Sequence, residues 1–364
     1  MPNVIYSASA GFNDAKLGKL TSALRTVIEY EADTKTKDDI LSSMYNMETS
    51  NKWGETIQLQ DEFGAFTATA EGANAEADSM ADTGRKLIEF VAFMKSFTIT
   101  KQMMDDANYG ISTDATRRAQ AFMRAYKSTR LDLGVAALTQ APTTKIKGDE
   151  AANNAIEFNG AKIDVTTADG LPLFSNAHTY GTTTDRGGHG VGTQSNYLGY
   201  KKASAKLSLE EFVDMLDAGV HQIRGMKDEN GRAMGWTADT LILPGTGNRL
   251  LERYAKQALG SEFNPADNTN AINIQCGNWK LIVLPQWHCT TDKFIVMSSD
   301  ANKQLAGNQF YTRVPLTLRD EIQTLSFNWL WAGYSRFGVG FGSYKHIAMV
   351  EAGTTAPAGA TLIS

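Results

Sequence analysis

The sequence predicts an α+β fold in two parts, and three observations support this prediction. Apolar residues recur at helical spacing across residues 113–138, which predicts one helix of about 39 Å. Strands and helices alternate between residues 196 and 304, a pattern typical of a mixed α/β layer. Aromatic and β-branched residues crowd residues 311–318 and 324–342, which predicts long strands. A chain of 364 residues is long enough for two structural domains.

The composition is that of an ordinary, mildly acidic protein. Hydrophobic residues make up 42% of the chain, charged residues make up 21%, and the formal net charge is -5. The sequence has no basic excess, which argues against a dedicated nucleic-acid binder. It opens without a secretory signal, and no apolar run reaches the roughly 20 residues of a membrane span. We therefore expect a soluble protein made in the cytoplasm, with Cys276 and Cys289 as free thiols.

Residues 1–50 are polar apart from one apolar ridge. The ridge predicts a helix over residues 16–31, with its apolar positions on one face: Leu17, Leu20, Leu24, Val27 and Ile28. Because this ridge is too thin to form a core alone, we expect an arm that packs on another part of an assembly. The alternative is the first helix of a domain.

An acidic hairpin is predicted next. Strand-forming residues at 55–69 and 86–100 flank a small, polar linker at residues 68–84. Between residues 61 and 82 there is no lysine or arginine, and there are six carboxylates: Asp61, Glu62, Glu71, Glu76, Asp78 and Asp82. Two strands bury too little surface to be stable alone, so the hairpin needs a partner. A disordered surface loop is the alternative.

The long helix carries the main basic face of the sequence. Ser112 is a candidate N-cap for this helix. Five cations fall on its predicted outer face: Arg117, Arg118, Arg124, Lys127 and Arg130. These side chains complement the acidic hairpin or the phosphates of DNA, and opposite charges on different subunits guide docking and fix register. A solvated face without a specific partner is the alternative.

The second part of the chain opens with a clear helix signal. Ser208 and Glu211 form a capping-box pattern, and the helix that follows ends near Arg224. A second helix is expected over residues 247–259. Three segments indicate buried strands: residues 240–243, 281–284 and 294–297. The C-terminal strands are expected to return and pair with the strands after the hairpin.

Patterns with catalytic or ligand-binding chemistry are sparse. His178, Asp185 and His189 offer two imidazoles and a carboxylate, but their spacing fits no closed metal site. Ser175 precedes His178 by three residues, yet the nucleophile elbow of a hydrolase is missing. Residues 245–249 follow a predicted strand and open a predicted helix, which is the position of a phosphate-binding loop. They lack the Lys-Ser/Thr pair that ends such a loop. We predict a turn histidine that bonds the backbone, and no catalytic, cofactor-binding or metal-binding residue.

Two strings in the sequence resemble a known family. Residues 169–181 read Asp-Gly-Leu-Pro-Leu-Phe-Ser-Asn-Ala-His-Thr-Tyr-Gly, and residues 236–244, after a polar turn, read Trp-Thr-Ala-Asp-Thr-Leu-Ile-Leu-Pro. Both resemble segments of the major capsid (head) proteins of tailed double-stranded DNA bacteriophages, of the Mu-like major head subunit type. The resemblance runs from about residue 51 to residue 350. It makes residues 169–181 a structural plug that positions the long helix against the second layer.

The resemblance implies the tailed-phage major capsid fold with six regions. These are an N-terminal arm (1–50), an extended β-hairpin loop and the start of a peripheral domain (51–100), the peripheral domain with a long spine helix (101–195), an axial α/β domain (196–304), return strands of the peripheral domain (305–352) and a C-terminal tail (353–364). It also implies a structural protein without cofactors that assembles into hexamers and pentamers of an icosahedral head around double-stranded DNA.

The implied partners follow from that role. They are further copies of the chain, scaffolding, portal and decoration proteins, and packaged DNA in non-specific contact. The implied location is the virion, after assembly in the host cytoplasm and without a membrane. An encapsulin-like nanocompartment shell is the alternative with the same fold, and a metal-assisted hydrolase is the alternative from another class.

Overall fold

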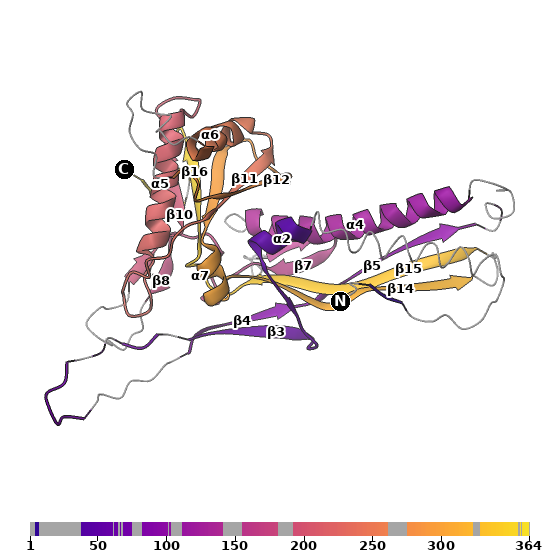
Figure 1. Ribbon diagram of the computed structural model, residues 1–364, viewed down its shortest axis with the longest axis horizontal. Helices are drawn as coiled ribbons and strands as arrows, with labels where there is room; N and C mark the ends of the chain where they lie inside the picture. Colours follow the sequence, from indigo (N-terminus) through magenta and orange to yellow (C-terminus); the bar gives the residue numbers. More distant parts are fainter. Residues whose placement is uncertain are drawn as a thin grey trace.

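The computed structural model describes residues 4–6, 38–60, 62–64, 66, 68–74, 82–100, 102, 111–140, 155–180, 192–260, 275–322, 328–355, 357 and 359–363. Figure 1 shows an elongated molecule with a long sheet and helix α4 (Ile111–Gln140) at one end. A second sheet stands at the other end with helices α5 (Leu209–Gly225) and α6 (Arg249–Gly260), and a hairpin extends below it. The predicted α+β class is confirmed. The helix expected over residues 16–31 lies outside the described residues.

The long sheet has five strands. β14 pairs antiparallel with β15, and β15 pairs antiparallel with β5, so that Trp331 lies opposite Phe97. The predicted return of the C-terminal strands to the strand after the hairpin is therefore confirmed. In order, the sheet contains β1 (Val4–Tyr6), β14 (Asn308–Ile322), β15 (Trp329–Phe341) and β5 (Val91–Ile99), with β2 (Asn46–Thr49) also on β14.

The single strand expected over residues 86–100 is in fact two strands. β4 (Asp82–Glu89) pairs antiparallel with β3 (Gly54–Gln60) to form the base of the hairpin, whereas β5 joins the long sheet. Phe90 separates them. Its side chain is buried against Tyr311, with ring centroids 6.0 Å apart, and its carbonyl accepts a hydrogen bond from Arg336. The chain thus turns around a buried aromatic residue, which an unbroken β-rich string does not reveal.

Helix α4 lies over the long sheet and extends two residues beyond each predicted end. Near its C-terminal end the helix is covered by α2 (Asp38–Met44). A Cβ at Gly134 would lie 2.6 Å from the end of the Leu41 side chain, so a larger residue here would require the buried Leu41 to shift. The Tyr45 hydroxyl donates a 2.7 Å hydrogen bond to the Gly134 carbonyl at the same crossing. This half of α4 therefore has core on more than one side.

The second sheet is apolar on both faces. Ile242 and Ile295 join the core shared with α4, whereas Leu241 and Val296 join the core under α5 and α6. Because helices cover both faces, its strands are short, continuous apolar runs. The predicted buried strands lie in its first three members: β12 (Lys280–His288), β11 (Thr240–Thr246), β13 (Asp292–Met297), β16 (Ile347–Gly353), β10 (Tyr197–Lys201) and β17 (Thr361–Leu362), in spatial order.

The capping box at the start of α5 is confirmed. The Ser208 hydroxyl accepts from the Glu211 amide, and the Glu211 carboxylate accepts from the Ser208 amide at 2.8 Å. The expected second helix is α6. In the turn before it, Gly247 has a φ of 93°, and a Cβ there would lie 2.4 Å from the Cys289 carbonyl oxygen. The glycines of residues 245–249 thus serve a tight strand-to-helix turn.

Not all of residues 305–352, expected as return strands of the peripheral domain, join the long sheet. β16 pairs instead with β13 and β10 in the second sheet. Residues 347–350 are fully buried, which suits the centre of a sheet covered on both faces. Within the expected C-terminal tail, β17 pairs with β10 at the edge of the same sheet.

Four short strands and one short helix complete the described elements. Two hairpins pair β6 (Ala155–Phe158) with β7 (Ala161–Asp164) and β8 (His178–Tyr180) with β9 (Gly192–Gln194); helix α7 covers Ser299–Gln304. Both cysteines are free, as predicted. Among the described helices, none has the length and apolar character needed to cross a membrane.

Candidate inter-subunit surface

The acidic hairpin extends away from the rest of the molecule (Figure 1). Of the six predicted carboxylates, Glu62, Glu71 and Asp82 are described, and all three side chains are exposed. Asp61, Glu76 and Asp78 lie outside the described residues. The exposed acids leave a negatively charged surface that is available to a second molecule.

The hairpin also exposes aromatic residues that the sequence reasoning did not select. Phe63 is 57% exposed and Phe66 is 105% exposed, so the ring of Phe66 has almost no neighbour in its own chain. Trp53, at the base of the hairpin, is 61% exposed. Aromatic side chains within a segment that is otherwise small and polar are the signal that could have identified them. Such rings supply much of the contact area in protein interfaces.

A loop beside the second sheet holds the hairpin where its tip begins. The Asn230 side-chain amide donates to the Glu62 carbonyl at 2.9 Å and to the Phe63 carbonyl at 3.3 Å. The Asn230 side chain is buried. These bonds fix the backbone next to the exposed Phe63 ring.

The loop that carries Asn230 is itself braced. The Asp228 carboxylate accepts a 2.7 Å hydrogen bond from the Arg232 amide, and Glu229 forms an ion pair with Lys345. Lys227 donates to the Tyr180 hydroxyl at 3.1 Å and lies 4.9 Å from the centre of the Tyr180 ring. The anchor of the hairpin is therefore connected to β8 and to the end of the second sheet.

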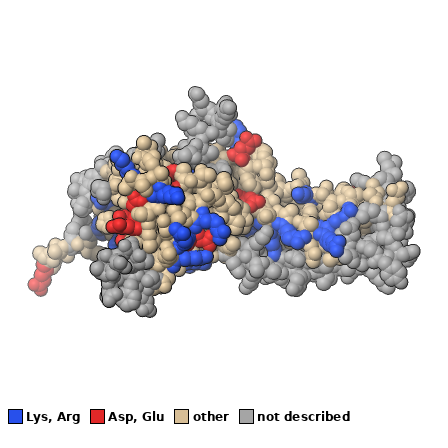
Figure 2. All heavy atoms as spheres, turned by 90° about the horizontal axis from the view of Figure 1, so that it is seen from above, with Lys and Arg blue, Asp and Glu red and all other residues tan. Residues whose placement is uncertain are grey.

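Three of the five cations predicted on α4 are at least partly accessible. Arg117 and Arg124 are exposed, and Arg118 is partly buried with its guanidinium donating to the Thr98 carbonyl at 2.8 Å. Figure 2, a view from above, shows lysine and arginine side chains over the end of the molecule that holds α4. The basic surface of α4 is thus concentrated in its N-terminal half.

The prediction that Lys127 and Arg130 also lie on an outer face is wrong. Both side chains are buried, at 7% and 8% exposure. The Arg130 guanidinium lies 5.2 Å from the centre of the Phe310 ring and 5.8 Å from that of Tyr126. A helical repeat identifies one buried face, but the C-terminal half of α4 is covered on more than one side, which brings these cations into the core.

The hairpin and the exposed cations of α4 are at opposite ends of the molecule (Figure 1). They do not meet within one chain. An electrostatic contact between them can therefore form only between two copies, and it stays a prediction.

The plug around His178 is part of the core, as predicted. Leu173 and Phe174 are buried in the cluster that joins α4 to the second sheet. The His178 Nδ1 lies 2.6 Å from an Asp169 carboxylate oxygen, and its Nε2 lies 3.3 Å from the Leu173 carbonyl. The imidazole stacks on the Tyr344 ring, with centroids 3.7 Å apart. The predicted backbone contact is present, together with a carboxylate that the sequence reasoning missed.

Asp169 acts as a structural acceptor. Burial favours its neutral form, but hydrogen bonds from His178, Thr167 and the Leu171 amide outweigh burial and hold the carboxyl pKa below its ordinary value. Because Asp169 and the Leu173 carbonyl engage both ring nitrogens of His178, this imidazole is not directed at Ser175. Ser175 itself accepts from the Ala177 amide. The described residues thus contain no nucleophile paired with His178.

A metal centre finds no support in the described part of the chain. His189 and Asp185 lie outside the described residues, and no group of three or more histidine, cysteine or acidic side chains among the described ones is placed to hold an ion. The ring nitrogens of His178 are engaged by the contacts given above.

Comparisons with known proteins give matches in structure alone. No protein-family model matches the sequence, and no curated protein matches it significantly. The capsid of the cyanophage P-SCSP1u superposes with a TM-score of 0.50 at 8% sequence identity, over 86% of this chain and 87% of that chain. The capsid of the Myoviridae phage XM1 gives a TM-score of 0.46 at 12% identity, over 84% of this chain and 89% of that chain. The procapsid of bacteriophage JBD30 gives a TM-score of 0.46 at 12% sequence identity, over 93% of this chain and 75% of that chain.

The likeness to the cyanophage capsid shows a shared fold over most of both chains. The predicted mixed α+β fold of phage capsid proteins is therefore confirmed.

Proposed function

We propose that this chain, with its tailed-phage major capsid fold, is a structural protein that assembles into the hexamers and pentamers of an icosahedral phage head. The fold shared with the cyanophage capsid carries the proposal. The head encloses double-stranded DNA, and the chain has no catalytic role. The Mu-like major head subunit type is a finer proposal, which rests on the strings at residues 169–181 and 236–244.

The hairpin supports a role in assembly. It presents the rings of Phe63 and Phe66 to solvent. Because exposed aromatic rings on a projecting segment are unfavourable in a free monomer, they favour association with another molecule. Contacts between different patches of identical chains are heterologous, and such contacts close into rings. A projecting hairpin spreads these contacts over neighbouring subunits, so the stability of a shell comes from many moderate interfaces.

The charge of the chain suits contact with packaged DNA without tight binding. A net charge of -5 gives no overall attraction for phosphates, so DNA can lie against the shell without being trapped there. We further propose that scaffolding, portal and decoration proteins join the assembly in the host cytoplasm, and that the finished location is the virion.

Electron microscopy of the purified protein tests the proposal. The chain is expressed alone and together with the genes that neighbour it. Closed shells, or rings of five and six, are expected in at least one of these conditions, whereas dispersed monomers in all of them would contradict the proposal. In particles made with the full gene set, nuclease-protected double-stranded DNA is expected; an enclosed enzyme without DNA would indicate a nanocompartment instead.

A further inference from the structure

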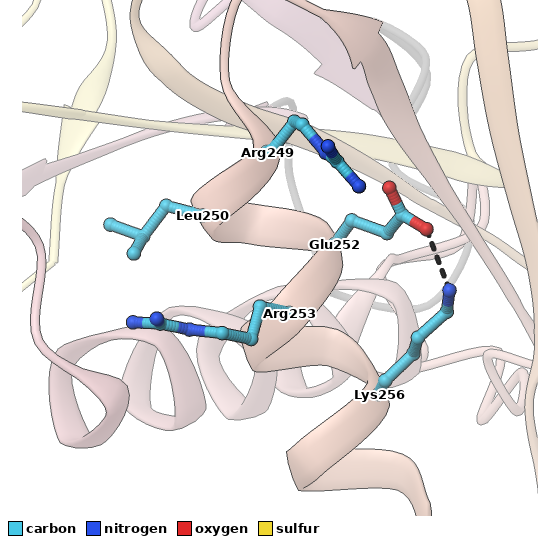
Figure 3. Close-up of a pocket in the computed structure, with 5 residues that line it drawn as sticks. All are labelled: Arg249, Leu250, Glu252, Arg253 and Lys256. Carbon is cyan, nitrogen blue, oxygen red and sulfur yellow. Dashed lines mark hydrogen bonds and ion pairs between the residues drawn. The ribbon is translucent and has the colours of Figure 1, made fainter.

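Helix α6 presents a basic stripe that the sequence reasoning did not identify. Arg249, Arg253 and Lys256 follow one another at spacings of four and three residues, opposite the buried Leu251 and Ala255. All three side chains are exposed. Together with Leu250 and Glu252, whose side chains Figure 3 shows along the helix, they line a hollow of about 500 Å³.

The stripe has a net positive charge that its own chain leaves largely uncompensated. Lys256 pairs with Glu252 one turn away at 2.6 Å, as the dashed line in Figure 3 marks. Arg249 and Arg253 make no ion pair within 4.0 Å with any carboxylate of the described residues. Arg253 instead lies 5.3 Å from the centre of the Tyr254 ring. The charge of Arg249 also interacts with that of Glu252, and the three cations together with Glu252 keep a net charge of +2 for an anionic partner.

Helix α5 presents a matching acidic stripe. Glu210, Asp214 and Asp217 are exposed at spacings of four and three residues, opposite the buried Phe212 and Met215. Their spacing is the same as that of the α6 cations. In the described part of the chain, no lysine or arginine forms an ion pair with these three carboxylates.

The described partners of the acidic stripe are neutral, so its charge persists. Gln275 donates to Asp217 at 2.6 Å, and the Tyr200 hydroxyl bonds to Asp214. Burial, and then the charges of Asp214 and Glu211, raise the pKa of Tyr200, so its hydroxyl stays a neutral donor. Neither of these described contacts brings a cation to the acidic stripe.

α5 and α6 pack against each other, but within the described residues no ion pair within 4.0 Å joins the two stripes. α5 and α6 cover the same face of the second sheet, with α6 packed on β11 and α5 packed on β13 and β16. Each stripe lies on the side of its helix that is turned away from that sheet, because the buried residues occupy the other side. A second molecule that presents the opposite charge can therefore dock on either stripe.

We propose that the basic stripe of α6 in one copy docks on the acidic stripe of α5 in the next copy. The inference rests on the proposed function and names one contact that joins neighbours in a ring. Because one copy carries both halves of the contact, a head-to-tail arrangement of copies is heterologous and repeats from copy to copy. Complementary stripes set the register between subunits and speed their encounter, and the effect weakens with salt.

Charge reversal with rescue tests this contact. Arg249→Glu combined with Arg253→Glu replaces two positive charges by two negative charges opposite the acidic stripe of the neighbour, so we expect about tenfold fewer shells than wild type at low salt. Glu210→Lys combined with Asp214→Lys is expected to act in the same way. The chain with all four changes carries swapped stripes and is expected to recover shells. Electron microscopy and sedimentation count the particles.

The variants remain interpretable if a result is negative. A carboxylate in the first turn of α6 suits the helix dipole, so the reversal at Arg249 leaves the helix intact, and circular dichroism checks the fold. Lys303→Glu with Arg319→Glu changes the net charge equally at exposed sites off α6 and is expected to assemble as wild type does. Normal assembly of the α6 variant, or failure of the four-change variant to recover, overturns this contact. A wild-type chain that forms no shells contradicts the proposed function instead.

Discussion

The side-chain amide of Asn230 donates a 2.9 Å hydrogen bond to the backbone carbonyl of Glu62, which lies 168 residues earlier in the chain. The same nitrogen reaches the Phe63 carbonyl at 3.3 Å. Since the Asn230 side chain is buried, water does not readily replace it. This contact fixes the point from which the acidic hairpin leaves the subunit.

Replacing Asn230 with alanine is expected to loosen the hairpin. The change removes two hydrogen bonds to backbone carbonyls and costs about 1–3 kcal/mol of unfolding free energy. Chymotrypsin is then expected to cut next to Phe63 and Phe66 faster than in wild type. Asn51→Ala, at an exposed position before the hairpin, is the matched control. Equal cleavage rates in both variants would show that Asn230 does not anchor the hairpin.

Changing Phe66 to serine is expected to separate assembly from folding. Its ring is fully exposed, so the unfolding free energy of the dispersed subunit changes by less than about 0.5 kcal/mol. Shell formation is expected to fall, because an interface loses an aromatic contact. Phe174→Ala is the contrasting variant: its ring is 2% exposed, and its loss costs about 3–5 kcal/mol of stability. Urea unfolding and particle counts give both quantities. Unimpaired assembly of the serine variant would exclude Phe66 from the interface.

The α4 cations are expected to divide into two classes. Reversing the exposed Arg117 and Arg124 to glutamate leaves stability within about 0.5 kcal/mol and reduces shell formation at low salt. Arg130→Ala lowers the unfolding free energy by about 1–3 kcal/mol, because the guanidinium packs on Phe310 and Tyr126 in the core. Urea unfolding of each variant, with sedimentation at two salt concentrations, measures both effects. A stability loss from the Arg117 and Arg124 reversals, with unchanged assembly, would contradict this division.

The buried His346 predicts a loss of stability in acid. Burial lowers the pKa of this imidazole to about 3, against about 6.5 in an unfolded chain. Between these values the unfolded chain binds one more proton, so the unfolding free energy falls as the pH falls from about 6.5 to about 3. The slope from this residue is up to about 1.4 kcal/mol per pH unit.

His346→Gln is the variant that isolates this proton. A glutamine amide can replace the imidazole as the partner of Asn308, whose side-chain oxygen lies 2.9 Å from His346 Nε2, and it does not titrate. Urea unfolding of dispersed subunits from pH 7 to pH 4.5 is expected to give a shallower pH dependence in the variant. The account of His346 is wrong if the two slopes are the same.

Much of the fold follows from local patterns in the sequence. The capping box of Ser208 and Glu211, the long apolar repeat of α4 and the apolar runs of the second sheet each depend on neighbours within a few residues. The pairing of β15 with β5 joins residues that are distant in sequence. It was still predictable, because each aromatic-rich strand needs a neighbouring strand to pair with. The plug at residues 169–181 was identified by resemblance to a family.

The wrong predictions concern residues whose burial or strand pairing is determined by parts of the chain that are distant in sequence. Lys127 and Arg130 are buried because several elements converge on the C-terminal half of α4, which a repeat on one helix cannot reveal. β16 joins the second sheet because that sheet has helices on both faces to cover it. The exposed Phe63 and Phe66 were overlooked for the opposite reason, since an aromatic residue is ordinarily expected in a core.

Cryo-electron microscopy of assembled particles, at a resolution that traces the chain, tests the central claim most directly. We expect a closed shell in which copies of this chain form rings of five and six, and in which each hairpin contacts a neighbouring subunit through residues 62–74. A closed shell in which the hairpins touch no neighbour would contradict the role given to the hairpin. Failure to find any closed assembly of this chain, in the presence of its neighbouring gene products, would contradict the claim that it is a shell-forming subunit.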